Sequence, residues 1–130
     1  MSLKSAESNV RTGPGTRYPI QWVYHRENMP VEVIEEFEHW RKIRDMDGTS
    51  GWVHKTMLDG ARYAIVKAKE PRVVRAEPSE KGRPLLKTEP KVIARVVECE
   101  KDWCRLLLSG RKGWIEKKYL FGVYPDEAID

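Results

Sequence analysis

The chain repeats one pattern of residues, and this repeat limits the folds that it can adopt. Residues 40–44 (WRKIR) and 51–53 (GWV) return as residues 103–107 (WCRLL) and 113–115 (GWI). Apolar residues also recur at the same offsets before each first tryptophan. A repeat of about sixty residues is too long for a solenoid unit and suits a small autonomous domain. The sequence therefore predicts two copies of one small module.

The composition favours compact β-modules over a helical bundle. The chain has 130 residues, of which 40% are hydrophobic and 34% are charged, so each half can bury only a small core. Five tryptophans offset the short length of each half, because a large aromatic side chain buries much apolar area. We therefore expect two small barrels.

The net charge of +4 is unevenly divided between the two halves. Residues 1–60 carry 8 Lys and Arg against 9 Asp and Glu, which gives −1, whereas residues 61–130 carry 16 against 11, which gives +5. The basic residues of the second half alternate with glutamates along the chain, a pattern typical of a solvated face. We therefore do not expect nucleic acid as the partner, although the second half would supply the charge for it.

The first half reads as a series of short strands joined by turns. Residues 13–15 (GPG) form a tight surface turn, and the segment that follows, residues 18–24, alternates like a half-buried strand. A phosphate-binding loop would precede a helix, so nucleotide binding is not expected. Further strands are predicted at 30–37, 40–44, 52–54 and 62–66, with a single helical or 3₁₀ turn at 55–58.

The second half follows the same plan. Strands are predicted at 72–76, 91–97, 103–108, 113–116 and 121–124, again with a helical turn at 117–120. The expected fold class is all-β, with two tandem small barrels of about five strands each and a late 3₁₀ turn. The expected boundaries are 4–66 for the first barrel, 67–71 for a short linker and 72–126 for a diverged second barrel.

The first half resembles the signature of bacterial SH3-like (SH3b) domains. The matching segments are residues 9–19 (NVRTGPGTRYP), 30–35 (PVEVIE), 40–44 (WRKIR) and 51–53 (GWV), which agree in order over nearly all of residues 7–58. In the second half the Gly-Pro-Gly turn has become Glu-Pro-Ser and the Tyr-Pro pair has become Arg-Pro, so only the core part of the signature remains.

The resemblance implies a non-catalytic module that binds cell-envelope peptides or peptidoglycan, often beside a cell-wall hydrolase domain. SH3-like barrels place one wall of their groove on the segment that here contains Tyr18, Trp22 and Tyr24. The candidate ligand-binding residues are Tyr18, Trp22, Tyr24, Glu36, Trp40 and Trp52. The competing interpretation places these rings in the core, and we expect the core for Trp40, Trp52, Trp103 and Trp114. A structural role in an envelope complex and a nucleic-acid-associated barrel are the alternative functions.

Cys99 and Cys104 bracket four residues that could form a hairpin turn, which would place their sulfurs opposite each other. A disulfide across so short a loop stabilises by about 2 kcal/mol in the chain-entropy model. The alternative is two buried free thiols. Because disulfides persist outside the cytosol, the pair favours a periplasmic or cell-surface location.

No metal, cofactor or catalytic residue is predicted. His25, His39 and His54 lack the spacing of a metal site, and nothing marks a base beside Cys104. The sequence contains no membrane-spanning stretch and no signal-peptide pattern. The opening residues 1–3 (MSL) resemble an artificial start, so we expect a native signal peptide to be absent from this sequence. The oligomeric state and the identity of the ligand remain open.

Overall fold

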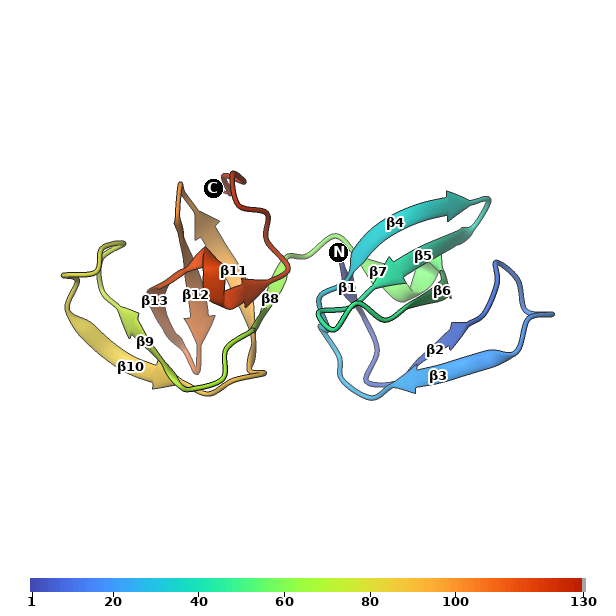
Figure 1. Ribbon diagram of the computed structural model, residues 1–130, viewed down its shortest axis with the longest axis horizontal. Coiled ribbons are helices and arrows are strands. Elements are labelled where there is room, and N and C mark those ends of the chain that lie inside the picture. The colour runs from blue at the N-terminus through green and yellow to red at the C-terminus, as the bar shows by residue number, and fades with distance from the viewer. Residues whose placement is uncertain (130) are drawn as a thin grey trace. The chain divides into compact units, whose positions relative to one another are not determined.

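The chain folds into two compact units, the first formed by Met1–Ala61 and the second by the residues from Arg62 onward. The computed structural model describes residues 1–129 (Figure 1). Each unit is built almost entirely from antiparallel strands, which confirms the expected all-β fold. Among the described residues, no helix is long and apolar enough to cross a membrane.

The first unit contains a five-stranded sheet in the order β3-β2-β6-β5-β4 and a two-stranded sheet of β1 and β7. A short 3₁₀ helix, η1, follows β6 at the position expected from the sequence. Its elements are β1 (Ser2–Leu3), β2 (Ser8–Arg11), β3 (Ile20–Tyr24), β4 (Glu32–Phe37), β5 (Trp40–Arg44), β6 (Ser50–His54), η1 (Lys55–Met57) and β7 (Leu58–Asp59).

The second unit contains one seven-stranded sheet in the order β10-β9-β13-β12-β11-β8-β14. The 3₁₀ helix η2 again follows the second strand of a long hairpin. The elements are β8 (Tyr63–Val66), β9 (Arg72–Arg75), β10 (Pro84–Thr88), β11 (Ile93–Cys99), β12 (Trp103–Leu108), β13 (Arg111–Glu116), η2 (Lys117–Tyr119) and β14 (Leu120–Phe121).

Strand β8 differs from the sequence-based expectation. Residues 62–66 were expected to close the first barrel, but β8 pairs with β11 and β14 and its Ala64 and Val66 belong to the core of the second unit. Residues 67–71, expected as a linker, also lie within the second unit, where Lys67 N donates a hydrogen bond to the carbonyl of Tyr119. The counterpart of β8 in the first unit is β1, which pairs with β7 in the same way.

Equivalent main-chain hydrogen bonds show that the two units are copies of one fold. Lys4 N donates to the carbonyl of Met57 at 3.0 Å, and Lys67 N donates to that of Tyr119 at 2.7 Å. Asn28 and Lys91 occupy equivalent turns in the two units, and their φ values of 61° and 69° are both left-handed. Further matched bonds are Leu3 N to Met29 O with Val66 N to Val92 O, and Arg11 Nη1 to Tyr18 O with Arg75 Nη1 to Gly82 O.

The loop after the first sheet strand is filled differently in the two copies. In the first unit the Tyr18 ring packs against Gly13, where an added Cβ would lie 2.5 Å from a ring carbon. In the second unit Glu77 stands at the position of Gly13 and Gly82 at the position of Tyr18. A Cβ on Gly82 would lie 2.6 Å from the carbonyl oxygen of Glu77. The glycine therefore stands at the start of this loop in the first unit, as Gly13, and at its end in the second unit, as Gly82.

The core of each unit is mainly aliphatic. The first core contains Leu3, Val10, Val31, Ile43, Val53 and Leu58. The second contains Ala64, Val66, Val74, Ala94, Val96, Cys99, Cys104, Leu106, Leu108, Ile115 and Leu120. Burial of these side chains supplies the main driving force for each unit.

The expectation that the tryptophans form the cores is wrong for three of the four residues concerned. Trp40, Trp52 and Trp103 are half-buried, whereas Trp114 is buried, as expected. Strand alternation gives the reason. On β6 the buried residues are Gly51 and Val53, so Trp52 points to the opposite face of the sheet.

A disulfide joins Cys99 and Cys104 across the turn between β11 and β12. The two residues are directly paired in the sheet register, and both are buried. Cys99 also exchanges two main-chain hydrogen bonds with Ile129, of 2.7 Å and 3.0 Å, so the end of the described chain lies along β11. No described cysteine is free.

Candidate functional site

A cleft of about 940 Å³ opens in the second unit. Its walls are the loop after β9, the turn between β11 and β12, η2 and the segment after β14. The lining residues are Lys67, Pro78, Ser79, Glu80, Lys81, Asp102, Trp103, Glu116, Lys117, Lys118, Leu120, Val123 and Pro125. Its volume lies within the range that is typical of ligand pockets.

Trp103 supplies the aromatic surface of this cleft. It begins β12, pairs with Glu116 on β13 and is half-buried, so part of its ring is accessible. The neighbouring disulfide and the hydrogen bond from Glu100 N to the carbonyl of Trp103 (2.9 Å) hold the turn that positions it. A second hollow of about 250 Å³ also touches Trp103 and Glu116. The ring therefore contributes to two adjoining hollows.

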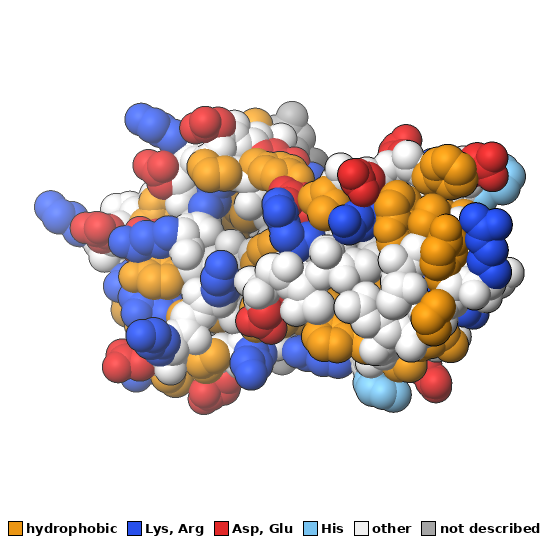
Figure 2. Space-filling view, turned by 45° about the vertical axis from the view of Figure 1, so that its right-hand side comes forward, with side chains coloured by type: hydrophobic (Ala, Val, Ile, Leu, Met, Phe, Trp, Pro, Cys, Tyr) orange, Lys and Arg blue, Asp and Glu red, His pale blue; other side chains and the backbone are white. Residues whose placement is uncertain are grey.

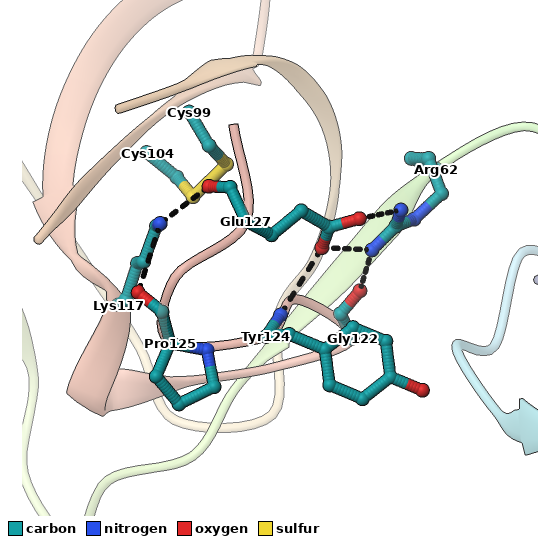
Figure 3. Close-up of a disulfide and its surroundings, with 8 residues drawn as sticks. All are labelled: Arg62, Cys99, Cys104, Lys117, Gly122, Tyr124, Pro125 and Glu127. Atoms are coloured by element: carbon teal, nitrogen blue, oxygen red, sulfur yellow. Dashed lines mark hydrogen bonds and ion pairs between the residues drawn. A yellow bond between two sulfur atoms is a disulfide. The ribbon is translucent and has the colours of Figure 1, made fainter. Parts of the chain in front are cut away.

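Lys117 holds the segment after β14 against the cleft. This side chain is only 7% exposed, and its Nζ donates hydrogen bonds to the carbonyls of Pro125 (3.1 Å) and Glu127 (2.5 Å) (Figure 3). Burying an ammonium group is costly unless it is hydrogen-bonded, so these two bonds explain its placement. Pro125 thereby becomes part of the cleft wall.

Arg62 and Glu127 form a second clasp on the same segment (Figure 3). The guanidinium group pairs with both carboxylate oxygens of Glu127 and donates to the carbonyl of Gly122 at 2.7 Å, and Tyr124 N donates to Glu127 at 3.1 Å. The hydrogen bond with Glu127 raises the pKa of Arg62, and the same bond lowers the pKa of Glu127. Both groups are therefore charged at neutral pH.

The cleft carries charges of both signs. Its lining contains Lys67, Lys81, Lys117 and Lys118 together with Glu80, Asp102 and Glu116. The Nζ of Lys118 lies 3.3 Å from Glu116, and the hydrogen bond between them raises the pKa of the lysine. A ligand with both an anionic and a cationic group would find partners in this lining.

The structure places three of the six predicted ligand-binding residues along one edge of the first unit. Trp22 is 41% exposed and meets Tyr24 edge to face, with ring centroids 5.7 Å apart. The hydroxyl of Tyr24 donates to Asp45 at 2.6 Å, and burial raises the pKa of Tyr24 above its usual value. Tyr18 packs against Gly13 in the preceding loop. Tyr24 also contacts the core, so it has a structural role.

The other three predicted residues lie on strands β4, β5 and β6. Trp40 meets His54 edge to face, with ring centroids 5.3 Å apart. Trp52 shares its face of the sheet with Trp40, since Trp52 pairs with Lys42, which lies two residues after Trp40 on β5. Glu36 forms an ion pair with Arg41 at 3.4 Å. The six residues are thus spread over the unit, and their role in binding remains a prediction.

The surfaces of the two units differ in character (Figure 2). Figure 2 shows many apolar side chains on the first unit. Its exposed large apolar residues include Ile20, Trp22, Ile34 and Phe37. Ile20 and Trp22 lie on β3, whereas Ile34 and Phe37 lie on β4 at the other end of the sheet order. Lysine, arginine and acidic side chains dominate the visible face of the second unit, in agreement with its content of charged residues.

Sequence reasoning missed the cleft residues of the second unit. The Gly-Pro-Gly turn and the Tyr-Pro pair occur only in the first unit, so the sequence signature indicated ligand-binding residues there. The repeat itself held the signal, since Trp103 stands at the position of Trp40. Among residues 1–129, no group of three or more His, Cys, Asp or Glu side chains could hold a metal ion.

Comparison with known proteins gives one family. The model of the family described as "Bacterial SH3 domain" matches residues 4–60 and again residues 68–122. No curated protein matches the chain. A solved structure of an NlpC/P60 family protein from Bacillus cereus ATCC 10987 is similar, at 13% sequence identity and a TM-score of 0.39. That match covers 92% of this chain and 55% of the other, so this chain spans about half of its length.

Proposed function

Because the chain belongs to the bacterial SH3 domain family over both of its repeats, we propose that it is a non-catalytic module that binds cell-envelope peptides or peptidoglycan. The observation that carries this proposal is the cleft around Trp103. It combines an accessible aromatic ring with charged groups of both signs, and peptides that bear free amines and carboxylates complement such a surface.

The disulfide supports a location outside the cytosol. Cys99 and Cys104 are joined, and disulfides persist in oxidising compartments. We therefore propose the periplasm or the cell surface as the site of action. Peptidoglycan and envelope peptides are accessible there, which agrees with the proposed ligand.

Binding to purified peptidoglycan sacculi tests the proposal. The whole chain should sediment with sacculi, and Trp103→Ala should weaken this binding about tenfold or more, because buried aromatic anchors dominate binding energy. Leu107→Ala is the matched control. Leu107 is 38% exposed on the same strand and does not line the cleft, so its loss should leave sedimentation unchanged.

Two results would contradict the proposal. Failure of the folded wild-type chain to sediment with sacculi would favour a structural role in an envelope complex. Binding to single-stranded RNA that weakens steeply between 50 and 200 mM salt would favour a nucleic-acid function, for which the +5 charge of residues 61–130 provides the electrostatic basis.

A further inference from the structure

The residues that line the cleft around Trp103 have counterparts in the first unit. Trp40 and Trp103 each begin a strand and pair with the last residue of the next strand, His54 and Glu116 respectively. His39 corresponds to Asp102, because their carbonyls accept the matched hydrogen bonds from Lys55 N (2.8 Å) and Lys117 N (2.9 Å). The further pairs are Lys4 with Lys67, Pro14 with Pro78, Gly15 with Ser79, Thr16 with Glu80, Arg17 with Lys81 and Thr56 with Lys118.

These counterparts form a surface in the first unit, here named the Trp40 surface. It consists of Lys4, Arg17, His39, Trp40, His54 and Lys55, together with Thr16 and Thr56. Its basic residues match three of the lysines in the cleft. The Trp40 surface differs from the cleft at its other positions: Thr56 replaces Lys118, and none of the three carboxylates of the cleft has an acidic counterpart. Glu80, Asp102 and Glu116 are replaced by Thr16, His39 and His54.

The two histidines lie close together beside Trp40. The ring centroids of His39 and His54 are 6.1 Å apart, and the ring of His54 meets Trp40 at 5.3 Å. His54 Nδ1 accepts a hydrogen bond from Thr56 N at 3.2 Å and lies 2.8 Å from the hydroxyl of the same threonine. Its Nε2 is therefore the ring nitrogen left for a ligand. His39 is exposed and His54 half-buried, so both are accessible.

The charged neighbours of this histidine pair carry both signs. Lys55 follows His54 directly, and Arg41 on β5 donates to the carbonyl of Trp40 at 2.9 Å. The carboxylate of Glu36 on β4 is paired with Arg41. Glu38 adjoins His39 along the chain, but its counterpart Lys101 does not line the cleft of the second unit. Arg17 lies on the loop after β2, where its guanidinium group contacts the ring and the hydroxyl of Tyr18.

We infer that the Trp40 surface binds a peptide carboxylate, with the Trp40 ring as the apolar contact, Lys55 and protonated His39 as the cationic partners, and the Nε2–H group of His54 as a hydrogen-bond donor. This inference rests on the proposed function and assigns different specificities to the two repeats: the first takes an anionic group, and the second takes a group of mixed charge. Histidine is the side chain whose charge ordinarily changes between pH 5 and 8, so binding strengthens as the pH falls.

Two synthetic peptides test this inference on the whole chain. N-acetyl-Ala-Ala-Ala with a free carboxylate and the same peptide with a C-terminal amide differ only in the group that the Trp40 surface is expected to recognise. NMR titration of the ¹⁵N-labelled protein, followed at the indole N–H signals of Trp40 and Trp103, separates binding at the two units. The acid should shift the Trp40 signal and bind more tightly at pH 5.5 than at pH 7.5, whereas the amide should leave it in place.

Histidine variants locate the pH dependence. His39→Gln and His54→Gln should each lower the affinity for the acid at pH 5.5 about two- to fivefold, since exposed charge pairs contribute modestly. His25→Gln is the matched control, because His25 is exposed outside the Trp40 surface and should change nothing. His39→Gln keeps the hydrogen bonds of His54 with Thr56, so it tests the charge of residue 39 even if His54→Gln disturbs η1.

Several results would overturn the inference. These are equal binding of the acid and the amide, an affinity that is the same at both pH values, and tighter binding of glycerol 3-phosphate than of the acid peptide. If sacculi bind and depend on Trp103 while the Trp40 signal does not respond to the acid, the inference fails and the proposed function stands. If sacculi do not bind but the acid shifts Trp40 as expected, the proposed function fails and the carboxylate site stands.

Discussion

Removing the disulfide should destabilise the second unit without changing its fold. The bond joins residues that are five apart in the sequence, and the chain-entropy model assigns about 2 kcal/mol to a loop of this size. For a domain as small as the second unit, 1 kcal/mol shifts the melting temperature by about 4–8 °C, so reduction of the disulfide should lower the melting temperature by about 8–16 °C. The main-chain pairing of β11 with β12 holds the hairpin without the cross-link, so we expect the hairpin to keep its register.

Thermal unfolding followed at the amide signals of Leu106 and Ile115 measures this effect, because both residues lie in the second core. The oxidised and reduced wild-type chains form the main comparison, since they differ only in the cross-link. Cys99→Ala/Cys104→Ala serves as the control, because dithiothreitol should not affect it. A loss below about 0.5 kcal/mol on reduction would refute the assignment of 2 kcal/mol to chain entropy.

Three further changes should report on packing, charge and hydrogen bonding. Gly113→Ala should cost about 1–3 kcal/mol in chemical denaturation, because its Cβ would lie 2.4 Å from a buried valine methyl group, whereas Gly60→Ala, with no atom within 4 Å, should be neutral; equal effects would contradict this. The pKa of Glu127 is lowered by Arg62, so the stability difference between wild type and Glu127→Gln should be present above pH 4.5 and shrink as the pH falls below it; a pH-independent difference would count against the ion pair. Tyr24→Phe should cost about 1 kcal/mol in urea unfolding through the lost bond to its carboxylate partner, and an unchanged midpoint would show that bond to be unimportant.

The repeated fold could be predicted from the sequence, because the strand-forming segments and the glycines that precede Trp52 and Trp114 recur in order. In both copies the glycine lies against a core valine, Val10 or Val74, which fixes the spacing of the pattern. The placement of β8 could not be predicted. Its counterpart β1 has only two residues, so the first copy offers no visible pattern with which to align it.

The candidate cleft could not be predicted from the sequence, for a different reason. Its walls come from segments far apart in the chain, and the segment near Pro125 is held there by Lys117, whose burial has no sequence signature. The prediction of the sheet face on which the tryptophan side chains lie was also wrong. Neighbouring strand residues alternate between faces, and the burial of Gly51 and Val53 would have placed Trp52 correctly had the phase of β6 been known.

The exchanged glycine in the loop after the first sheet strand limits how this protein can be engineered. Placing tyrosine alone at Gly82 would drive its side chain against the carbonyl of Glu77, because the space that Tyr18 uses exists only where residue 13 is glycine. Specificity grafts between the repeats must therefore transfer the loop as a single block. Residues 13 and 18 in the first unit, and residues 77 and 82 in the second, should therefore be exchanged together as pairs.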